Sequence, residues 1–196
     1  MRLRNSTYSY GAIAKWMHWL TALLFLAAYI SVYYRQWFTE AKTPENWTAL
    51  QLHLSIGVTI GVLVVLRIIW KIMNRSPEPE PGSNWEHFAA KAGHYALYAV
   101  MIAMPLTGYL GTGVNTEYFF LFDIPKFEST QLFQDVVVIG MDMNFKEFEQ
   151  TIDFIHKDIG GAWLVWLLIL GHVMAALYHH FVKKDRTLQK MTLTID

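Results

Sequence analysis

Four apolar windows, each long enough to cross a bilayer, constrain the fold of this chain more than any other feature. They cover roughly residues 16–37, 50–73, 94–114 and 157–181. A helix of about 20 residues spans the hydrocarbon core. Only 16% of the 196 residues are charged, against about a quarter in a typical soluble domain. A buried core helix could explain one such window. Four in one short chain predict an all-α membrane protein, a four-transmembrane-helix bundle forming a single domain over 1–196.

The first window does not have the pattern of a cleaved signal peptide. Its apolar run exceeds the ~7–15 residues of a signal h-region, and no small-residue cleavage pattern follows it. It ends in aromatic residues and Arg35, as membrane interfaces do. The chain has no cysteine, which excludes disulfides, thiolate metal sites, iron–sulfur clusters and covalent c-type haem attachment.

The basic residues indicate an orientation for these spans. Of the 16 Lys and Arg residues, 11 fall on the side of the two termini and five on the other side. The 11 are Arg2, Arg4, Lys15, Arg67, Lys71, Arg75, Lys91, Lys183, Lys184, Arg186 and Lys190. Because basic residues stay in the cytoplasm, we expect both termini to be cytoplasmic.

The connections differ in character. The inner one, "NRSPEPEPGSNWEHFAAKAG", is a Pro-rich extended linker. The long outer loop, 115–155, holds eight acidic residues against Lys126 and Lys146, a net charge of −6. Within it, "MNFKEFEQTIDFI" places Phe145, Phe148, Ile152 and Ile155 at helical spacing. That spacing predicts a short helix lying on the membrane surface.

Five histidines sort into two depths of the predicted bundle. His53 and His156 lie at the outer level, and His18, His94 and His172 lie at the inner level. Sixteen positions separate His156 from His172, or about 24 Å of α-helix. Each level therefore offers histidines from different helices.

This sorting favours haem ligation. Neutral imidazole is a common axial ligand of haem iron, and bundles build cofactor sites from facing helices. Two levels suit two bis-histidine haems b. A lone intramembrane histidine can instead bond a neighbouring helix, and a zinc or copper site or a proton relay would also use histidine. From the residues alone these alternatives stay open.

Glycines accompany the histidines. They are Gly57, Gly61, Gly160, Gly161 and Gly171. Small residues leave shallow helix surface, which suits either a flat macrocycle or close helix packing. The pair His179 and His180 stands beside Lys183 and Lys184 and is read as a cap at the inner surface.

Four segments in order and spacing carry a family resemblance: "KWMHWLTALLFLAAY", "LQLHLSIGV", "AGHYALYAVMIAMPLTGYL" and "GHVMAALYHHFVKKDRTL". They resemble the bacterial cytochrome b561 family of small four-helix di-haem membrane proteins, which includes a superoxide oxidase. The resemblance covers nearly the whole chain and is weak over 115–155. It implies a multi-pass protein of the bacterial inner membrane. It also implies a role in respiratory electron transport.

Matched motif by motif, the resemblance implies an inner haem held by His18 and His172 and an outer haem held by His53 and His156. It implies that His94 lies beside the inner site without ligating. It also implies ubiquinone as a partner, alongside membrane lipid and an electron donor of unknown kind; nucleic acid is not expected.

The chain departs from the family pattern at His156. Similar proteins have about fourteen positions between the two histidines of the last helix, and two extra positions at ~100° each would turn His156 by about 200°. The Gly160–Gly161 pair could absorb this turn as a loosened first turn or a π-bulge. Met141 and Met143 of the outer loop are alternative sources of a ligand.

The acidic loop is the second departure. Superoxide is an anion, which a net charge of −6 repels. The resemblance implies superoxide oxidation coupled to ubiquinone reduction, whereas the charge favours a neutral or cationic donor. The expected function is a di-haem cytochrome passing electrons from an outer donor to quinone. The alternatives are a haem-bearing membrane anchor subunit of a dehydrogenase or hydrogenase, and a haem-free transporter or proton-relay protein.

Overall fold

The computed structural model describes residues 2–193, and most of them are helical. The main helices are α1 (Ala12–Phe38), α2 (Pro44–Met73), α3 (Asn84–Leu110) and a continuous helix over Phe145–Lys183. The last one consists of α5 (Phe145–Asp153), the π-helical η3 (Phe154–Leu164), α6 (Val165–Tyr178) and the π-helical η4 (His179–Lys183).

Three helices in the described part are long and apolar enough to cross a membrane: α1, α2 and Phe145–Lys183. α3 is as long as α1, with 27 residues, but its first turns carry the polar residues Glu86, His87 and Lys91. The structure is thus that of a helical membrane protein.

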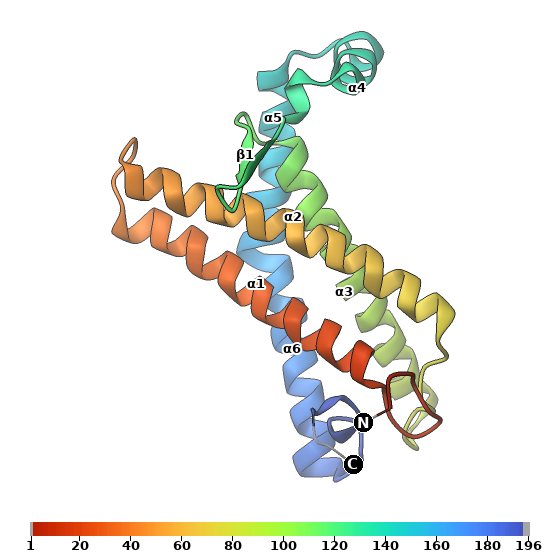
Figure 1. The fold of residues 1–196 in the computed structure, drawn as a ribbon. Helices are drawn as coiled ribbons and strands as arrows, with labels where there is room; N and C mark the ends of the chain where they lie inside the picture. Colours follow the sequence, from red (N-terminus) through yellow and green to blue (C-terminus); the bar gives the residue numbers. More distant parts are fainter. Residues whose placement is uncertain (1, 194–196) are drawn as a thin grey trace.

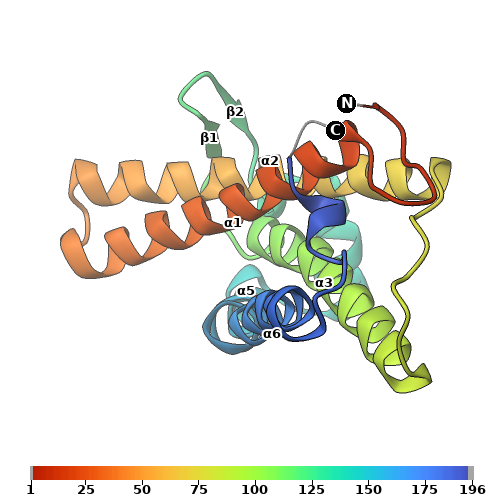
Figure 2. The same ribbon diagram turned by 90° about the horizontal axis from the view of Figure 1, so that it is seen from below.

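The helices form two crossed pairs (Figures 1 and 2). α1 and α2 run antiparallel and side by side in both views, while α3 and the last helix pass across them at a steep angle. Helices α1, α2 and α3 share an apolar core of Ile56, Ile60, Val64 and Met101. α1 is joined to η3 and α6 by side chains: the Tyr29 hydroxyl donates to the Gly161 carbonyl of η3 (2.8 Å) and Trp166 Nε1 of α6 donates to the Tyr33 hydroxyl (3.1 Å).

Caps explain where the helices begin. Thr43 Oγ1 accepts from the Asn46 amide at the start of α2, with Pro44 in the first turn. Ser83 and Glu86 form a capping box that starts α3 ten residues before the expected span, while Gly111 ends it early, after Leu110. The prolines of the linker, at 77, 79 and 81, cannot continue α2.

The outer segment differs from the expected loop over 115–155. Asn144 and Glu147 form a second capping box, so the helix begins at Phe145 and continues into η3 rather than forming a separate surface helix. The part of this segment before Asn144 begins with a hairpin of β1 (Thr116–Tyr118) and β2 (Phe122–Ile124). Three short helices follow: η1 (Phe127–Ser129), α4 (Gln131–Phe133) and η2 (Gln134–Gly140). A mainly aromatic cluster of Phe127, Phe133 and Phe148, with Val137, packs this segment together.

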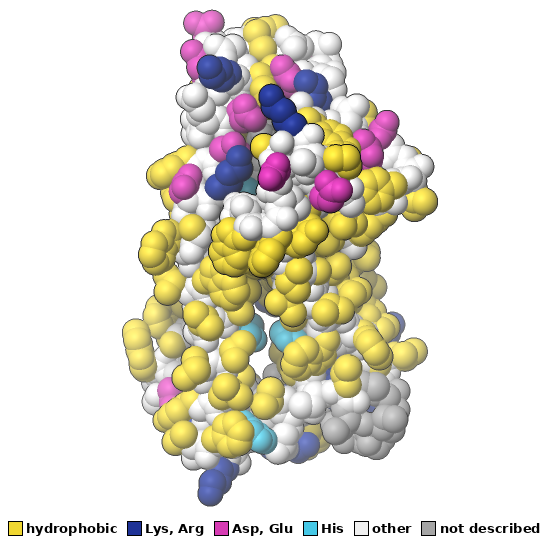
Figure 3. Space-filling view, turned by 90° about the vertical axis from the view of Figure 1, so that its left-hand side faces the viewer, with side chains coloured by type: hydrophobic (Ala, Val, Ile, Leu, Met, Phe, Trp, Pro, Cys, Tyr) yellow, Lys and Arg dark blue, Asp and Glu magenta, His cyan; other side chains and the backbone are white. Residues whose placement is uncertain are grey.

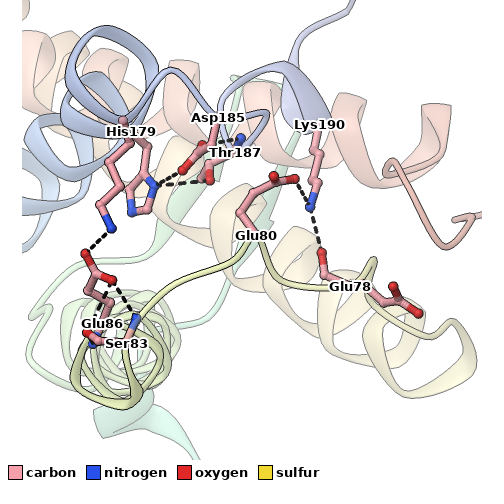
Figure 4. Close-up of polar contacts among 9 residues, drawn as sticks. Glu78, Glu80, Ser83, Glu86, His179, Asp185, Thr187 and Lys190 are labelled. Atoms are coloured by element: carbon pink, nitrogen blue, oxygen red, sulfur yellow. Dashed lines mark hydrogen bonds and ion pairs between the residues drawn. The ribbon is translucent and has the colours of Figure 1, made fainter.

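Polar contacts close the opposite end of the molecule. Asn5 Nδ2 donates to the Arg75 carbonyl (3.0 Å) and the Glu78 amide donates to the Thr7 carbonyl (3.0 Å). The C-terminal segment adds Lys190, which pairs with Glu80, and a further ion pair joins Lys183 to Glu86 (Figure 4). This end of the molecule also contains the short helix η5 (Gln189–Met191).

The surface agrees with a membrane position. On the face shown in Figure 3, hydrophobic side chains cover the middle, and acidic and basic side chains gather at the upper end. Large apolar side chains are exposed along the helices, among them Trp16, Leu23, Ile30, Ile69, Trp163 and Leu167. Such broad apolar exposure is typical of lipid-facing surface.

Candidate functional site

The outer histidines face each other across the two helix pairs. His53 projects from α2 and His156 from η3, and their ring centroids are 6.3 Å apart with an interplanar angle of 81°. The structure therefore brings together the two residues that the sequence analysis paired at the outer level.

The inner histidines form a group of three. The ring centroids of His18 on α1 and His172 on α6 are 6.1 Å apart, at 57°. His94 on α3 lies 5.7 Å from His172, at 85°. Ring separation alone therefore leaves His172 with two neighbours. Histidine side chains border a hollow in the lower half of Figure 3.

These separations fit an iron atom between two imidazoles. Two metal–nitrogen bonds of about 2 Å each, plus the distance from each nitrogen to its ring centre, sum to about 6 Å. The His18–His172 and His53–His156 separations, 6.1 and 6.3 Å, both meet this requirement. The donor chemistry is also suitable, because neutral imidazole ligates haem iron.

The outer imidazoles have their Nδ1 atoms engaged. His53 Nδ1 lies 3.1 Å from the Ala28 carbonyl oxygen, so it donates there, and 3.3 Å from Ser31 Oγ. His156 Nδ1 lies 3.0 Å from Thr107 Oγ1, which itself donates to the Ala103 carbonyl (2.7 Å). The Thr107 oxygen therefore accepts from His156 Nδ1–H. With Nδ1–H donating, Nε2 of each neutral ring keeps its lone pair, and histidines that bind metals commonly have their second nitrogen bonded in this way.

Two of the flanking glycines border open space. A Cβ added to Gly57, one turn after His53, or to Gly171, next to His172, would meet no atom within 4 Å. Gly61 packs against Pro105 instead, and Gly160 packs against Met104. Gly57 and Gly171 thus provide the flat surface that a macrocycle needs beside its ligands, whereas Gly61 and Gly160 serve helix packing.

The shifted spacing of His156 coincides with an irregular helix. The segment η3, over Phe154–Leu164, is π-helical and contains both His156 and the Gly160–Gly161 pair. Wider π turns contain more residues than α turns, so they take up extra positions with less rotation. His156 consequently faces His53 despite the two additional residues.

The methionine alternative has less geometric support. Met143 packs against the outer aromatic cluster, and Met141 is 53% exposed in that segment. Within residues 2–193 no group of three or more His, Cys, Asp or Glu side chains converges on one point. An axial pair needs only two side chains.

Three residues beside the outer histidines were not predicted from the sequence. Thr107 and Ser31 bond the outer imidazoles. Gly108 lies under His156, because its added Cβ would be 3.0 Å from His156 Cε1. Thr107 and Gly108 occur in "MPLTGYL", one of the segments that carried the resemblance, and a search for polar or small residues facing each histidine would have identified them.

Comparisons with known proteins identify the family of this chain. The family model described as prokaryotic cytochrome b561 matches residues 9–193. Cytochrome b561 homolog 2 of Escherichia coli K12 is 30% identical over 97% of this chain and 95% of its own length. Cytochrome b561 homolog 1 of the same organism is 27% identical over 90% and 92%. The probable superoxide oxidase CybB of Yersinia pestis is 27% identical over 93% and 94%.

The family match covers nearly the whole chain, including every histidine discussed above. The chain therefore belongs to the prokaryotic cytochrome b561 family of haem b-binding membrane proteins that transfer electrons.

Proposed function

We propose that this protein is a di-haem b cytochrome that transfers electrons across the bacterial inner membrane, from a donor on the outer side to a quinone. The single observation that carries this proposal is the presence of two histidine pairs with nearly equal ring separations, 6.1 and 6.3 Å. His18 with His172 would hold the inner haem, and His53 with His156 the outer one. Haem b, when bound, supplies a reversible one-electron iron couple.

The proposal includes four membrane crossings with both termini in the cytoplasm. α3 has 27 residues, or about 40 Å of helix, which exceeds the ~30 Å hydrocarbon core. The distribution of basic residues supports the orientation. A C-terminal reporter active only in the periplasm would contradict it.

The residues of the chain have defined tasks in this scheme. The four histidines fix the two sites at different depths, and the Ala28 carbonyl and Thr107 hold the outer rings with Nε2 free. The apolar helices would limit the access of water to both sites. Limited access of water in turn influences the reduction potentials of the two haems. At the quinone, two electrons and two protons give the quinol; we expect ubiquinone.

The donor is the second part of the proposal. The relative named a probable superoxide oxidase makes superoxide the first donor to test: it would lose one electron and leave as oxygen. The segment 115–155 with its net charge of −6 would slow an anion and favour a cationic or neutral donor.

The remaining rival is a haem-bearing anchor subunit of a dehydrogenase or hydrogenase. Such a subunit would purify with its partner at fixed stoichiometry, and it would take electrons from that partner rather than from a small molecule. Membership of a haem b-binding electron-transfer family opposes the haem-free transporter and proton-relay readings.

A pyridine haemochrome assay combined with reduced-minus-oxidised spectra tests the proposal. We expect two non-covalent haems b per chain. His18→Ala and His172→Ala should each remove the same haem, and His53→Ala and His156→Ala should remove the other. His87→Ala, in the first turn of α3, is the matched control and should keep both. One haem per chain, or none, contradicts the proposal.

The same series decides between the two neighbours of His172. If His94→Ala abolishes the inner haem while His18→Ala keeps it low-spin, the inner pair is His94 with His172. We expect the reverse, with His94→Ala retaining both haems.

A further inference from the structure

Arg67 is an intramembrane cation at the inner histidine group. It is the one Lys, Arg, Asp or Glu in the sequence between Glu45 and Lys71, and it lies six residues before the end of α2. Charged residues inside membrane segments are costly and usually mark function. We therefore examine which groups surround the Arg67 guanidinium.

The guanidinium of Arg67 contacts the helices that supply the inner histidines. Nη1 donates to the carbonyl of Met17, the residue before His18, at 3.5 Å. The guanidinium carbon lies 6.0 Å from the ring centroid of Tyr98, one turn after His94 on α3. Arg67 thus lies at the inner group.

Arg67 has no anionic partner among the described residues. The five ion pairs found within residues 2–193 do not include it. A guanidinium has five N–H donors, and the bond to Met17 is at the distance limit. An uncompensated charge away from water is strongly unfavourable. The site therefore lacks an acceptor that carries negative charge.

A second side-chain donor near the end of α2 has no acceptor among the described residues. Trp70 Nε1 is buried and has no hydrogen-bond partner in the described part of the chain. Residues three apart lie on the same side of a helix, so Trp70 and Arg67 share a side of α2. Lys71, 4.2 Å from the Tyr98 ring centroid, adds a second cation to this side. None of these three side chains pairs with a carboxylate among the described residues.

We propose that Arg67 binds a propionate carboxylate of the inner haem and thereby raises the reduction potential of that haem. The inference rests on the proposed inner site. Haem b carries two propionates, and a planar guanidinium recognises a carboxylate through paired N–H bonds. Since reduction adds negative charge, a cation held at the haem edge stabilises the reduced form. Arg67 is in this sense a positioning and potential-setting residue, not a ligand.

Redox titration of the whole protein, followed by visible spectroscopy, tests this role. Arg67→Gln should keep both haems and shift the midpoint potential of the inner haem downward, while the outer haem stays unchanged. Arg67→Lys should restore most of the shift because it keeps the charge. Arg75→Gln is the control: it removes an exposed arginine beyond the end of α2 and should shift neither potential. Spectra of His18→Ala identify the inner haem.

Reconstitution with the dimethyl ester of haem b provides a second measurement, because that haem carries no carboxylate charge. The shift caused by Arg67→Gln should be clearly smaller with the ester, because the carboxylate no longer holds the guanidinium at the haem edge. An equal shift with haem b and with its ester would overturn the inference, since Arg67 would then act without the propionate. Unchanged potentials in Arg67→Gln would overturn it as well.

Haem loss gives an equally clear result. Loss of the inner haem in Arg67→Gln with retention in Arg67→Lys supports the inference, whereas loss in both variants overturns it. In each of these outcomes the wild-type protein still contains two haems, so the proposed function stands. A wild-type protein without the inner haem would instead defeat the proposed function.

Discussion

Hydrogen bonds at Nδ1 orient the rings of the two outer histidines, His53 and His156. The Thr107 hydroxyl donates to the Ala103 carbonyl and accepts from His156 Nδ1. This chain of two bonds sets the tautomer and the ring orientation together. Partners of this kind make a ligating imidazole more basic.

Thr107→Val tests that bond. The substitution keeps the shape and removes the acceptor of His156 Nδ1–H, so the imidazole should become a poorer electron donor to iron. We expect the outer haem potential to rise and its affinity to fall by about 10–100-fold, measured by redox titration and by haem retention against a competing apo-protein. Thr107→Ser is the control and should resemble the wild type. Equal behaviour of the valine and serine variants would show that the bond has no influence on the site.

At the scale of elements, the π-helical segment η3 decides where His156 points. Its carbonyls do not all follow the α-helical pattern, and the Tyr29 hydroxyl of α1 donates to the Gly161 carbonyl. Tyr29 also lies against Trp166, with ring centroids 4.6 Å apart. α1 therefore supports the irregular turn from the side.

Tyr29→Phe removes this support while keeping the ring. We expect a loss of about 1 kcal/mol in unfolding free energy, the usual net value of one hydrogen bond, and a broadened electron paramagnetic resonance signal of the outer haem. Denaturant unfolding in detergent and the spectrum at low temperature measure the two effects. Tyr34→Phe, whose ring stacks on Phe38 at the surface, should change neither. A sharp, unshifted outer signal in Tyr29→Phe would contradict the role given to Tyr29.

The start of α3 gives a pH-dependent contribution to stability. The Glu86 carboxylate, in the first turn and before the predicted span, accepts from Lys183 and from the Ser83 amide (Figure 4). These bonds, that to Lys183 foremost, lower the pKa of Glu86 from 4.5 to about 2. A lowered acid pKa means that the stabilisation is present above pH 4.5 and disappears as the pH falls toward 2.

We therefore expect unfolding free energy to decrease in the wild type between pH 4.5 and 2, and to decrease less in Glu86→Gln. Both groups are at the surface, so the difference should be small and should shrink in high salt. Glu78→Gln is a suitable control, because only the backbone of Glu78 takes part in this network. Identical pH curves for Glu86→Gln and wild type would disprove the contribution.

The sequence predicted the helices well but their ends poorly. Apolar length identifies a span, whereas the position at which a helix begins is set by caps such as Ser83 and Asn144, outside the apolar windows. Histidine depth predicted which rings would meet at the outer level. It could not rank His18 against His94 as the neighbour of His172, because that depends on how α1 and α3 cross α6. Thr107 and Arg67 were not predicted as site residues, since their roles arise only when two helices come together.

At the scale of the whole molecule, the acidic segment 115–155 is the surface that an outer donor would meet in the proposed scheme. Several of its carboxylates have structural tasks: Glu147 caps α5, Asp153 pairs with Lys157, and Asp135 accepts from Gln131. Replacing them would disturb the fold as well as the charge. The side-chain carboxylates of Asp123, Asp142 and Glu149 form no hydrogen bond or ion pair in the described part of the chain, so they can be neutralised.

Asp123→Asn, Asp142→Asn and Glu149→Gln together reduce the negative charge by three. We expect faster reduction of the outer haem by superoxide and slower reduction by the methyl viologen radical cation, because the field acts on the encounter. Stopped-flow rates at low ionic strength measure both, and the differences should fade in high salt. Unaltered rates with both donors would show that this charge does not govern access.

The crossed arrangement of the two helix pairs also determines when the protein can mature. Each histidine pair takes one ring from the α1–α2 hairpin and the other from the last helix, Phe145–Lys183. Neither pair exists until the ribosome has made that helix and it has inserted beside the first two. A nascent chain that stops before His156 contains His18 and His53 but neither of their partners on the last helix. If these pairs hold the haems, as proposed, both cofactors can bind only at the end of synthesis, after the last helix has packed against α1 and α2.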